Sequence, residues 1–364
     1  MNVNSMWRPP GAETVEFRLA VECCRWAFAG GDQGEVRKLV MDVNWDRFID
    51  IVRFHRVQGL VWKCLSVARC APDPVSEQLA GEARAIAAAN LRMAVEARRL
   101  HGAFAEAGIA VLFVKGLTLG QLAYGDALLK MGWDIDLLID PADLGRAATL
   151  IGSLGYRLRR PAETRQLAAW HRRNKDSEWA SREGIHVELH TRLTENSRLL
   201  PGTGIRSPSR VIALAPGIAV PTLQEEELFA YLCVHGASSL WFRLKWITDL
   251  AAILHPLNAG QIARLYASSQ VLGAGRTSAC ALLLADALYG SLRGSPLRDE
   301  LTGDRQSRWL YRAAFRQLAG RPDPREPTAK IGGTARIHLA QLLSLPGARF
   351  KLSELARQVR AVLA

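Results

Sequence analysis

Two aspartates, Asp134 and Asp136, lie one residue apart in the otherwise apolar run KMGWDIDLLID. An isolated carboxylate is costly to remove from water, so two of them in a segment suited to burial indicate a counter-charge. In a β-strand alternate side chains share a face, which puts both aspartates on one face and Trp133, Ile135 and Leu137 on the other. Mg²⁺ prefers hard oxygen ligands and takes further ones from water and substrate phosphates. The run therefore predicts a metal site.

A second alternating segment, IHVELH, supplies a third carboxylate, Glu188, whose expected face it shares with His186 and His190. If the two strands are neighbours, three acids converge, as a two-metal phosphoryl transfer requires. Glu178 and Glu183 lie close in the sequence and would take the third position if the strand register differed. The two histidines could contact nucleotide or acceptor, or lie half-exposed beside the site.

The segment FVKGLTLGQ places Gly116 where an apolar strand is expected to end and a helix to begin. A glycine lets backbone amides approach a phosphate closely, and the helix N-terminus adds partial positive charge. Lys115 could add a full positive charge, and Thr118 offers a hydroxyl two residues after the glycine. This turn is therefore predicted to bind phosphate.

The elements that position these residues divide the chain into three parts. Residues 1–107 are expected to be helical, residues 108–221 to form a small α/β unit and residues 222–364 to be helical again. The helical patterns of the first part cover 14–29, 44–70 (two short helices meeting near Gly59) and 75–108. In the last part, breaks are expected near 290–296 and 320–327.

Within the α/β part the expected strands are 109–114, 133–139, 156–160 and 184–193, with a helix over 141–155. Residues 163–183 are polar and ambiguous. The prolines between 201 and 216 indicate a loop region. Thr222, followed by Glu225 three residues later, has the capping-box pattern of a helix N-terminus.

Composition sets broader bounds on function. Lys plus Arg outnumber Asp plus Glu by 47 to 35, and the net charge of +12 suggests an anionic partner such as a nucleotide, nucleic acid or acidic surface. A basic solvated surface would explain the same excess. The six cysteines have neither CxxC nor Cys/His ligand spacing, so neither zinc nor a disulfide framework is indicated. No leader or transmembrane pattern is recognised, which predicts a cytoplasmic protein without a membrane partner.

The order of strand, glycine turn, helix, DxD strand and later carboxylate strand resembles the nucleotidyltransferase superfamily typified by DNA polymerase beta. Four segments, VKGLTLGQLAYGD, KMGWDIDLLID, HVELH and LCVHGASSLWFRLKWITDLA, are similar to a largely uncharacterised bacterial nucleotidyltransferase family within it. The resemblance spans about residues 15–300. It implies an α+β fold in which a small mixed β-sheet core is flanked by helical regions at both ends.

The resemblance also implies a reaction, the Mg²⁺-dependent transfer of a nucleoside monophosphate from an NTP. ATP is the expected donor, Mn²⁺ the alternative ion, and the acceptor a hydroxyl of an unidentified small molecule, peptide or protein. Asp134, Asp136 and Glu188 would be the catalytic residues and metal ligands. The expected nucleotide contacts are Lys115, Gly116, Thr118, Lys130, His235 and Lys245.

Two positions depart from the pattern. Leu117 stands where the superfamily has Gly or Ser, and Lys130 stands where the related family carries an arginine, so the charge is kept but not the bidentate fork. They support a second hypothesis, in which the protein binds nucleotide or has a regulatory role but does not transfer a nucleoside monophosphate. A third hypothesis, an RNA-end-modifying nucleotidyltransferase, draws on the +12 charge, although no aromatic-interleaved basic motif supports it.

Overall fold

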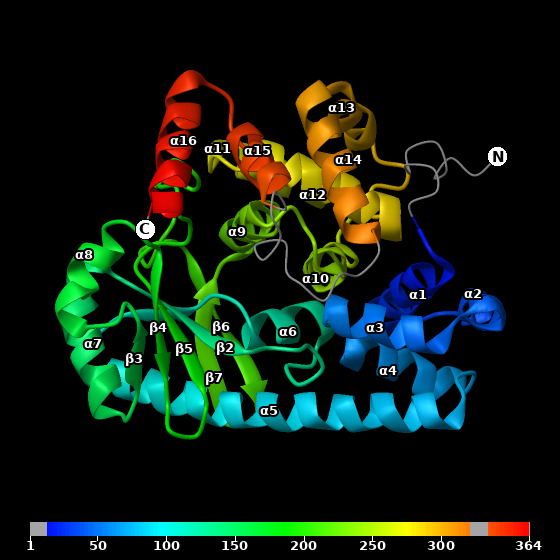
Figure 1. The fold of residues 1–364 in the computed structure, drawn as a ribbon, viewed down its shortest axis with the longest axis horizontal. Coiled ribbons are helices and arrows are strands. Elements are labelled where there is room, and N and C mark those ends of the chain that lie inside the picture. Colours follow the sequence, from blue (N-terminus) through cyan, green and yellow to red (C-terminus); the bar gives the residue numbers. More distant parts are fainter. Residues whose placement is uncertain (1–12, 321–333, 364) are drawn as a thin grey trace. The chain divides into compact units, whose positions relative to one another are not determined.

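The computed structural model describes residues 13–320 and 334–363, which fall into two compact units. The first unit joins the described residues up to Ala83 to those from Phe229 onward, and the second is Arg84–Leu228. Helix α5 (Asp73–Glu106) contains the boundary and is one unbroken ribbon in Figure 1. The site residues on strands and on the glycine turn all belong to the second unit.

The second unit is built on a five-stranded sheet of order β1-β2-β5-β4-β3. Its strands are β1 (Val111–Phe113), β2 (Asp134–Ile139), β3 (Arg157–Arg160), β4 (Asp176–Ala180) and β5 (His186–His190). The pair β2·β5 is parallel and the other pairs are antiparallel. This small mixed sheet with helices around it confirms the predicted α+β class.

Besides the first residues of α9 (Glu225–Ser238), which begins within its bounds, four helices longer than a single turn belong to this unit or enter it. They are the second part of α5, α6 (Leu117–Tyr124), α7 (Leu144–Ser153) and α8 (Leu167–His171), with short 3-10 turns at Pro141–Asp143 and Thr164–Gln166. The helix expected over 141–155 is therefore confirmed as a 3-10 turn that continues into α7.

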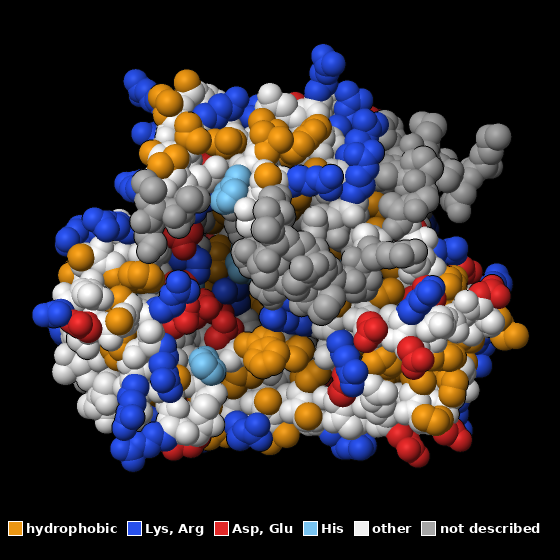
Figure 2. Space-filling view, in the orientation of Figure 1, with side chains coloured by type: hydrophobic (Ala, Val, Ile, Leu, Met, Phe, Trp, Pro, Cys, Tyr) orange, Lys and Arg blue, Asp and Glu red, His pale blue; other side chains and the backbone are white. Residues whose placement is uncertain are grey.

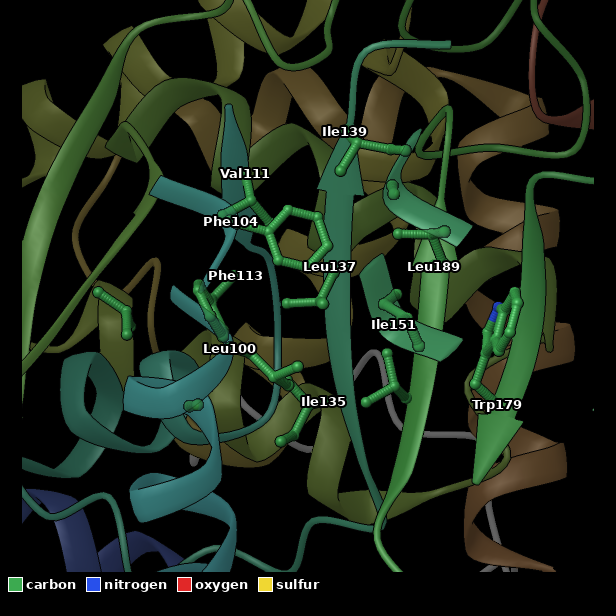
Figure 3. Packing of buried hydrophobic residues seen from close by; sticks show 14 of the residues in the cluster. Leu100, Phe104, Val111, Phe113, Ile135, Leu137, Ile139, Ile151, Trp179 and Leu189 are labelled. Carbon is green, nitrogen blue, oxygen red and sulfur yellow. The ribbon is translucent and has the colours of Figure 1, made fainter. Parts of the chain in front are cut away.

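One face of the sheet is apolar and holds the core of the second unit. Ile135, Leu137 and Ile139 of β2 point toward the same side as Leu189 and Trp179, and Leu100 and Phe104 of α5 and Ile151 of α7 cover them (Figure 3). Each apolar side chain of this size contributes about 1.5–3 kcal/mol when fully buried. The alternation predicted for DIDLLI is confirmed from Asp134 onward. Trp133 is an exception, because β2 begins after it and its side chain is 56% exposed.

Three strands were not expected from the sequence. β4 lies in the segment 163–183 whose pattern was ambiguous, and β6 (Ser209–Ala215) and β7 (Ile218–Leu223) form a hairpin where prolines indicated a loop. Leu214, Ile218 and Val220 of this hairpin join the apolar core. The capping prediction at Thr222 is wrong, because that residue is the last but one of β7 and α9 begins at Glu225.

The described part of the first unit is all helical. Its N-terminal helices are α1 (Val15–Ala29), α2 (Gly34–Leu39), η2 (Val40–Asp42), α3 (Trp45–His55), α4 (Gln58–Ala68) and the start of α5. Its C-terminal helices are α9 (Glu225–Ser238), α10 (Leu244–Leu254), α11 (Ala259–Val271), α12 (Gly275–Tyr289), α13 (Leu297–Gly303), α14 (Arg305–Ala319), α15 (Ala335–Leu343) and α16 (Ala348–Leu363). The predicted break at 290–296 is confirmed, whereas nearly all of the one at 320–327 lies outside the described residues.

None of the helices in the described ranges combines the length and the apolar character needed to cross a membrane.

Candidate metal and nucleotide site

The polar face of the sheet brings two predicted carboxylates together. Asp136 on β2 and Glu188 on β5 are paired in register across the parallel strands, so their side chains leave the sheet side by side. Asp136 is only 3% exposed, whereas Glu188 is half-buried. In Figure 2 acidic side chains gather over β5 and β2, and basic side chains border them.

His190 lies between these carboxylates and is fully buried. Its Nε2 is 3.0 Å from Asp136 Oδ1 and 3.1 Å from Glu188 Oε2. Lys115 approaches the same carboxylate, with Nζ 2.7 Å from Asp136 Oδ1. The sequence places His190 on this face, either in contact with nucleotide or acceptor or half-exposed; the half-exposed position is wrong for His190, which is fully buried, and its place between the two carboxylates is a finding of the structure.

A second pair of charges, at the start of β4, borders the first. Asp176 is in register with His190, and its Oδ2 is 3.8 Å from His190 Nδ1. Lys175 forms an ion pair with Asp176, and its Nζ is 3.9 Å from Glu188 Oε2. Sequence reasoning missed Asp176. The weak alternation of DSEWA, with Ser177 and Trp179 pointing into the core side, is the signal that could have found it.

The surrounding charges shift the titration of this group. Burial opposes ionisation of Asp136, but Lys115 and the hydrogen bond with His190 outweigh it and hold the pKa of Asp136 well below its usual value. Burial also acts against the charged form of Asp176, while His190 and Lys175 lower its pKa. For His190, burial and Lys175 lower the pKa, but the hydrogen bonds with Asp136 and Glu188 raise it overall. The cluster thus holds negative carboxylates beside cationic groups.

The turn between β1 and α6 places Gly116 beside β2. Gly116 has φ 61° and ψ −118°, and a Cβ on it would be 3.3 Å from the backbone oxygen of Asp134. A side chain at this position would be strained by the positive φ and crowded by the Asp134 carbonyl, which explains why the residue is glycine. The Thr118 hydroxyl donates to the carbonyls of Phe113 and Lys115 at 3.2 and 3.0 Å, so it fixes this turn. The first amides of α6 therefore begin beside the carboxylate strand, as a phosphate-binding turn requires.

A buried amide on α5 holds the loop that leads into β2. Asn90 Nδ2 donates to the carbonyls of Ala127, Leu128 and Lys130 at 3.3, 2.9 and 2.7 Å. A Cβ on Gly132 would lie 3.5 Å from Asn90 Oδ1. Lys130 is 9% exposed, so its stem is enclosed where the loop turns. Sequence patterns gave no indication of Asn90, because its partners are backbone groups far along the chain.

The remaining carboxylates and the exposed histidine of this face lie around the central three residues. Asp134 begins β2 in register with His186, which is exposed. Glu178 on β4 is in register with Glu188 on β5, and its Oε1 is 3.5 Å from Nη1 of Arg160. Glu183 is exposed in the turn before β5. The metal role of Asp134 and the nucleotide contacts of the turn residues stay predictions.

His235 and Lys245 belong to the first unit, on α9 and α10. The His235 ring packs edge-on against Trp246, with centroids 5.6 Å apart. Lys245 is 8% exposed, and Asp249, four residues later on the same helix, is 1% exposed, so both side chains are buried. A nucleotide contact by His235 or Lys245 stays a prediction.

The donor set on the polar face fits a divalent cation. One ligand atom from each of Asp136, Glu188 and His190 lies within 4.8 Å of the others. Asp136 Oδ2 is buried and has no hydrogen-bond partner among the described residues, which is costly for a carboxylate oxygen unless a cation or donor satisfies it. Carboxylates on adjacent strands beside a glycine turn at a helix N-terminus are the arrangement expected of a nucleotidyltransferase.

A comparison with protein families agrees with that class. A family model described as uncharacterised nucleotidyltransferase matches residues 41–290, and the chain belongs to this family. A comparison with curated proteins finds no match.

Proposed function

We propose that the protein is a divalent-metal-dependent enzyme that transfers a nucleoside monophosphate from an NTP, with ATP as the expected donor, to an acceptor hydroxyl. The observation that carries the proposal is the in-register pair of Asp136 and Glu188 on adjacent parallel strands. The glycine turn at Gly116 begins beside the same strand. Family membership supports the transferase class.

In the proposed reaction the acceptor oxygen bonds to the α-phosphorus, the bond from the α-phosphorus to the bridging oxygen breaks, and pyrophosphate leaves. Asp134, Asp136 and Glu188 would hold the metal, which when bound neutralises the phosphates and the leaving pyrophosphate. Glu188, the more exposed of the two paired carboxylates, takes the proton of the acceptor hydroxyl. The amides of the Gly116 turn and Lys115 bind the phosphates.

The experiment is calorimetric titration of ATP and of a non-hydrolysable analogue, with and without Mg²⁺. Wild type is compared with the double variant Asp134→Ala/Asp136→Ala on β2. The matched control is Glu178→Ala, a carboxylate on β4 that lies on the same face of the sheet. Metal-dependent binding that is lost in the double variant and kept in the control supports the site, and an acceptor screen by pyrophosphate release then follows. Binding that ignores both the metal and the aspartates overturns the proposal.

A second candidate function, nucleotide binding without transfer, is favoured by the ion pair of Lys115 with Asp136, which places a protein cation on a metal-ligand carboxylate. Leu117 and Lys130 favour it as well. Metal-dependent binding without pyrophosphate release across small-molecule, peptide, protein and RNA acceptors would support it. Binding of RNA that weakens steeply with salt would instead point to an RNA-end acceptor.

A further inference from the structure

The donor set of the site contains a nitrogen. His190 Nε2 lies 3.0 Å from Asp136 Oδ1 and 3.1 Å from Glu188 Oε2, and the histidine is fully buried beneath both carboxylates. With one ligand atom from each of the three residues inside a 4.8 Å group, a single ion can contact all three. Mg²⁺ sites use oxygen ligands, so a buried imidazole among the donors is unusual for that ion.

Two buried atoms of this group lack a hydrogen bond within the described residues. One is Asp136 Oδ2, a carboxylate oxygen that a cation would satisfy, and the other is His190 Nδ1. His190 Nδ1 faces Asp176 Oδ2 at 3.8 Å, across the register pair of β5 and β4. A carboxylate that accepts a hydrogen bond from one ring nitrogen fixes the tautomer in which the other nitrogen binds a metal, and Asp176 is the carboxylate that faces Nδ1, at 3.8 Å in this structure.

We propose that His190 binds the catalytic divalent ion through Nε2, that Asp176 is the positioning residue behind it, and that the site consequently prefers Mn²⁺ to Mg²⁺. The proposal rests on the proposed function and deepens it by naming the ion. An imidazole nitrogen favours first-row transition ions over Mg²⁺, because Mg²⁺ gains little from nitrogen ligands and keeps its waters.

The experiment measures Mn²⁺ binding to the full chain without nucleotide, by the loss of the free-ion paramagnetic resonance signal, with Mg²⁺ as competitor. Pulsed measurements then detect a nitrogen bonded to bound Mn²⁺, and ¹⁵N-histidine labelling of wild type shows whether it belongs to histidine. The expected result is a histidine nitrogen signal and a Kd for Mn²⁺ about tenfold or more below that for Mg²⁺.

The variant His190→Gln puts an amide oxygen at a similar reach and is expected to remove the nitrogen signal and most of the preference for Mn²⁺. His186→Gln, at the exposed end of the same strand, is the matched control and keeps both. Asp176→Asn is expected to keep the nitrogen signal but to weaken Mn²⁺ binding about tenfold. A purely structural role of Asp176 would leave the affinity of the folded protein for Mn²⁺ unchanged.

Failure of this inference is distinguishable from failure of the proposed function. Mn²⁺ that binds in an Asp136-dependent way without a histidine nitrogen, or Mg²⁺ that binds equally well, overturns the role of His190 and leaves the carboxylate site intact. If neither ion binds with or without ATP, both proposals are overturned. Because the labelling experiment uses wild type, the absence of a histidine nitrogen would overturn the role of His190 even if a variant did not fold.

Discussion

Two fully buried histidines, one in each unit, have opposite surroundings. His190 in the sheet of the second unit lies between carboxylates, which raise its pKa. His55 at the end of α3 in the first unit lies beside Arg243, and burial together with this cation lowers its pKa from 6.5 to about 3. His55 Nδ1 accepts the backbone amide of Leu244 at 3.1 Å, and its ring packs against Phe17 and Phe54.

The difference separates a histidine that supports the fold from one that lies in the candidate metal site. The lowered pKa of His55 favours its neutral form, and its hydrogen bond from the Leu244 amide connects α3 to the start of α10. His190 lies beside the carboxylates of Asp136 and Glu188, whose negative charges a cation would neutralise. The neighbouring Asp136 Oδ2 is buried and has no hydrogen bond within the described residues. Burial alone therefore does not distinguish the two roles, whereas the charge of the neighbouring groups does.

The largest expected effect comes from removing a cation at the carboxylates. Lys115→Met removes one of two cationic partners of Asp136 and leaves His190, and the Lys115 and Asp136 side chains are 15% and 1% exposed. The free energy of unfolding in urea without metal should fall by about 3 kcal/mol, because breaking a buried pair leaves a charge that is only partly compensated. Added Mn²⁺ should stabilise the variant more than it stabilises wild type.

The control for Lys115→Met is Lys38→Met. Lys38 is 79% exposed and pairs with Glu35 at 3.7 Å, so its loss should cost about 0.5 kcal/mol or less. Equal losses in the free energy of unfolding for the two variants would show that the buried ion pair at Asp136 stabilises the fold no more than an exposed one.

The next effect concerns His55. His55→Leu removes the acceptor of the Leu244 amide, and an unsatisfied buried donor costs about 1–3 kcal/mol. Urea unfolding should show a loss of about 2 kcal/mol, while metal binding at Asp136 stays as in wild type. His255→Leu, at an exposed position after α10, should change the free energy of unfolding by about 0.5 kcal/mol or less. A change in metal affinity in His55→Leu would contradict the division of roles.

The pH dependence of stability should differ in sign between the two histidines. The folded protein keeps His55 neutral, whereas the unfolded chain takes up a proton near 6.5, so stability is lost as the pH falls from about 6.5 toward about 3. The slope from this group is at most about 1.4 kcal/mol per pH unit. His171, whose pKa burial lowers to about 4, adds to the same slope.

His190 acts in the opposite direction, because its raised pKa gives stability that is present at low pH and is lost as the pH rises through the folded value. Urea unfolding of wild type and His55→Leu between pH 7 and pH 5 measures the His55 part. An unchanged slope in the variant would rule out a neutral buried His55.

The smallest effect separates the two causes of the His55 shift. The guanidinium carbon of Arg243 lies 4.6 Å from the Phe54 ring and 4.8 Å from the Phe242 ring, close to the histidine. Arg243→Gln removes the charge and should raise the pKa of His55 only part of the way to 6.5, because burial is the larger cause. Nuclear magnetic resonance titration of the His55 ring measures this pKa, and Arg53→Gln, at an exposed position, is the control. A complete return to 6.5 would show that the charge dominates.

The sequence predicted the parts of the site that depend on local alternation. Asp136 and Glu188 were assigned to one face because strands alternate, and the glycine turn was found from the change of pattern at Gly116. Asn90 was missed for a physical reason, since its partners are backbone groups of a distant segment, whereas Asp176 was missed because the alternation of its strand is weak. The hairpin β6·β7 was missed because Pro216 and Gly217 form its turn and the flanking prolines indicated a loop.

The parallel pairing of β2 with β5 also sets when the site can form during folding. The contact between His190 and Asp136 joins residues 54 apart in the sequence, and a parallel pair needs a long crossover before its first hydrogen bond forms. Chain segments that close such loops gain their contacts late, because the entropy of closure is lost first. The donor set therefore exists only once β2 and β5 have paired, and ion binding by all three residues reports that this pair is in place.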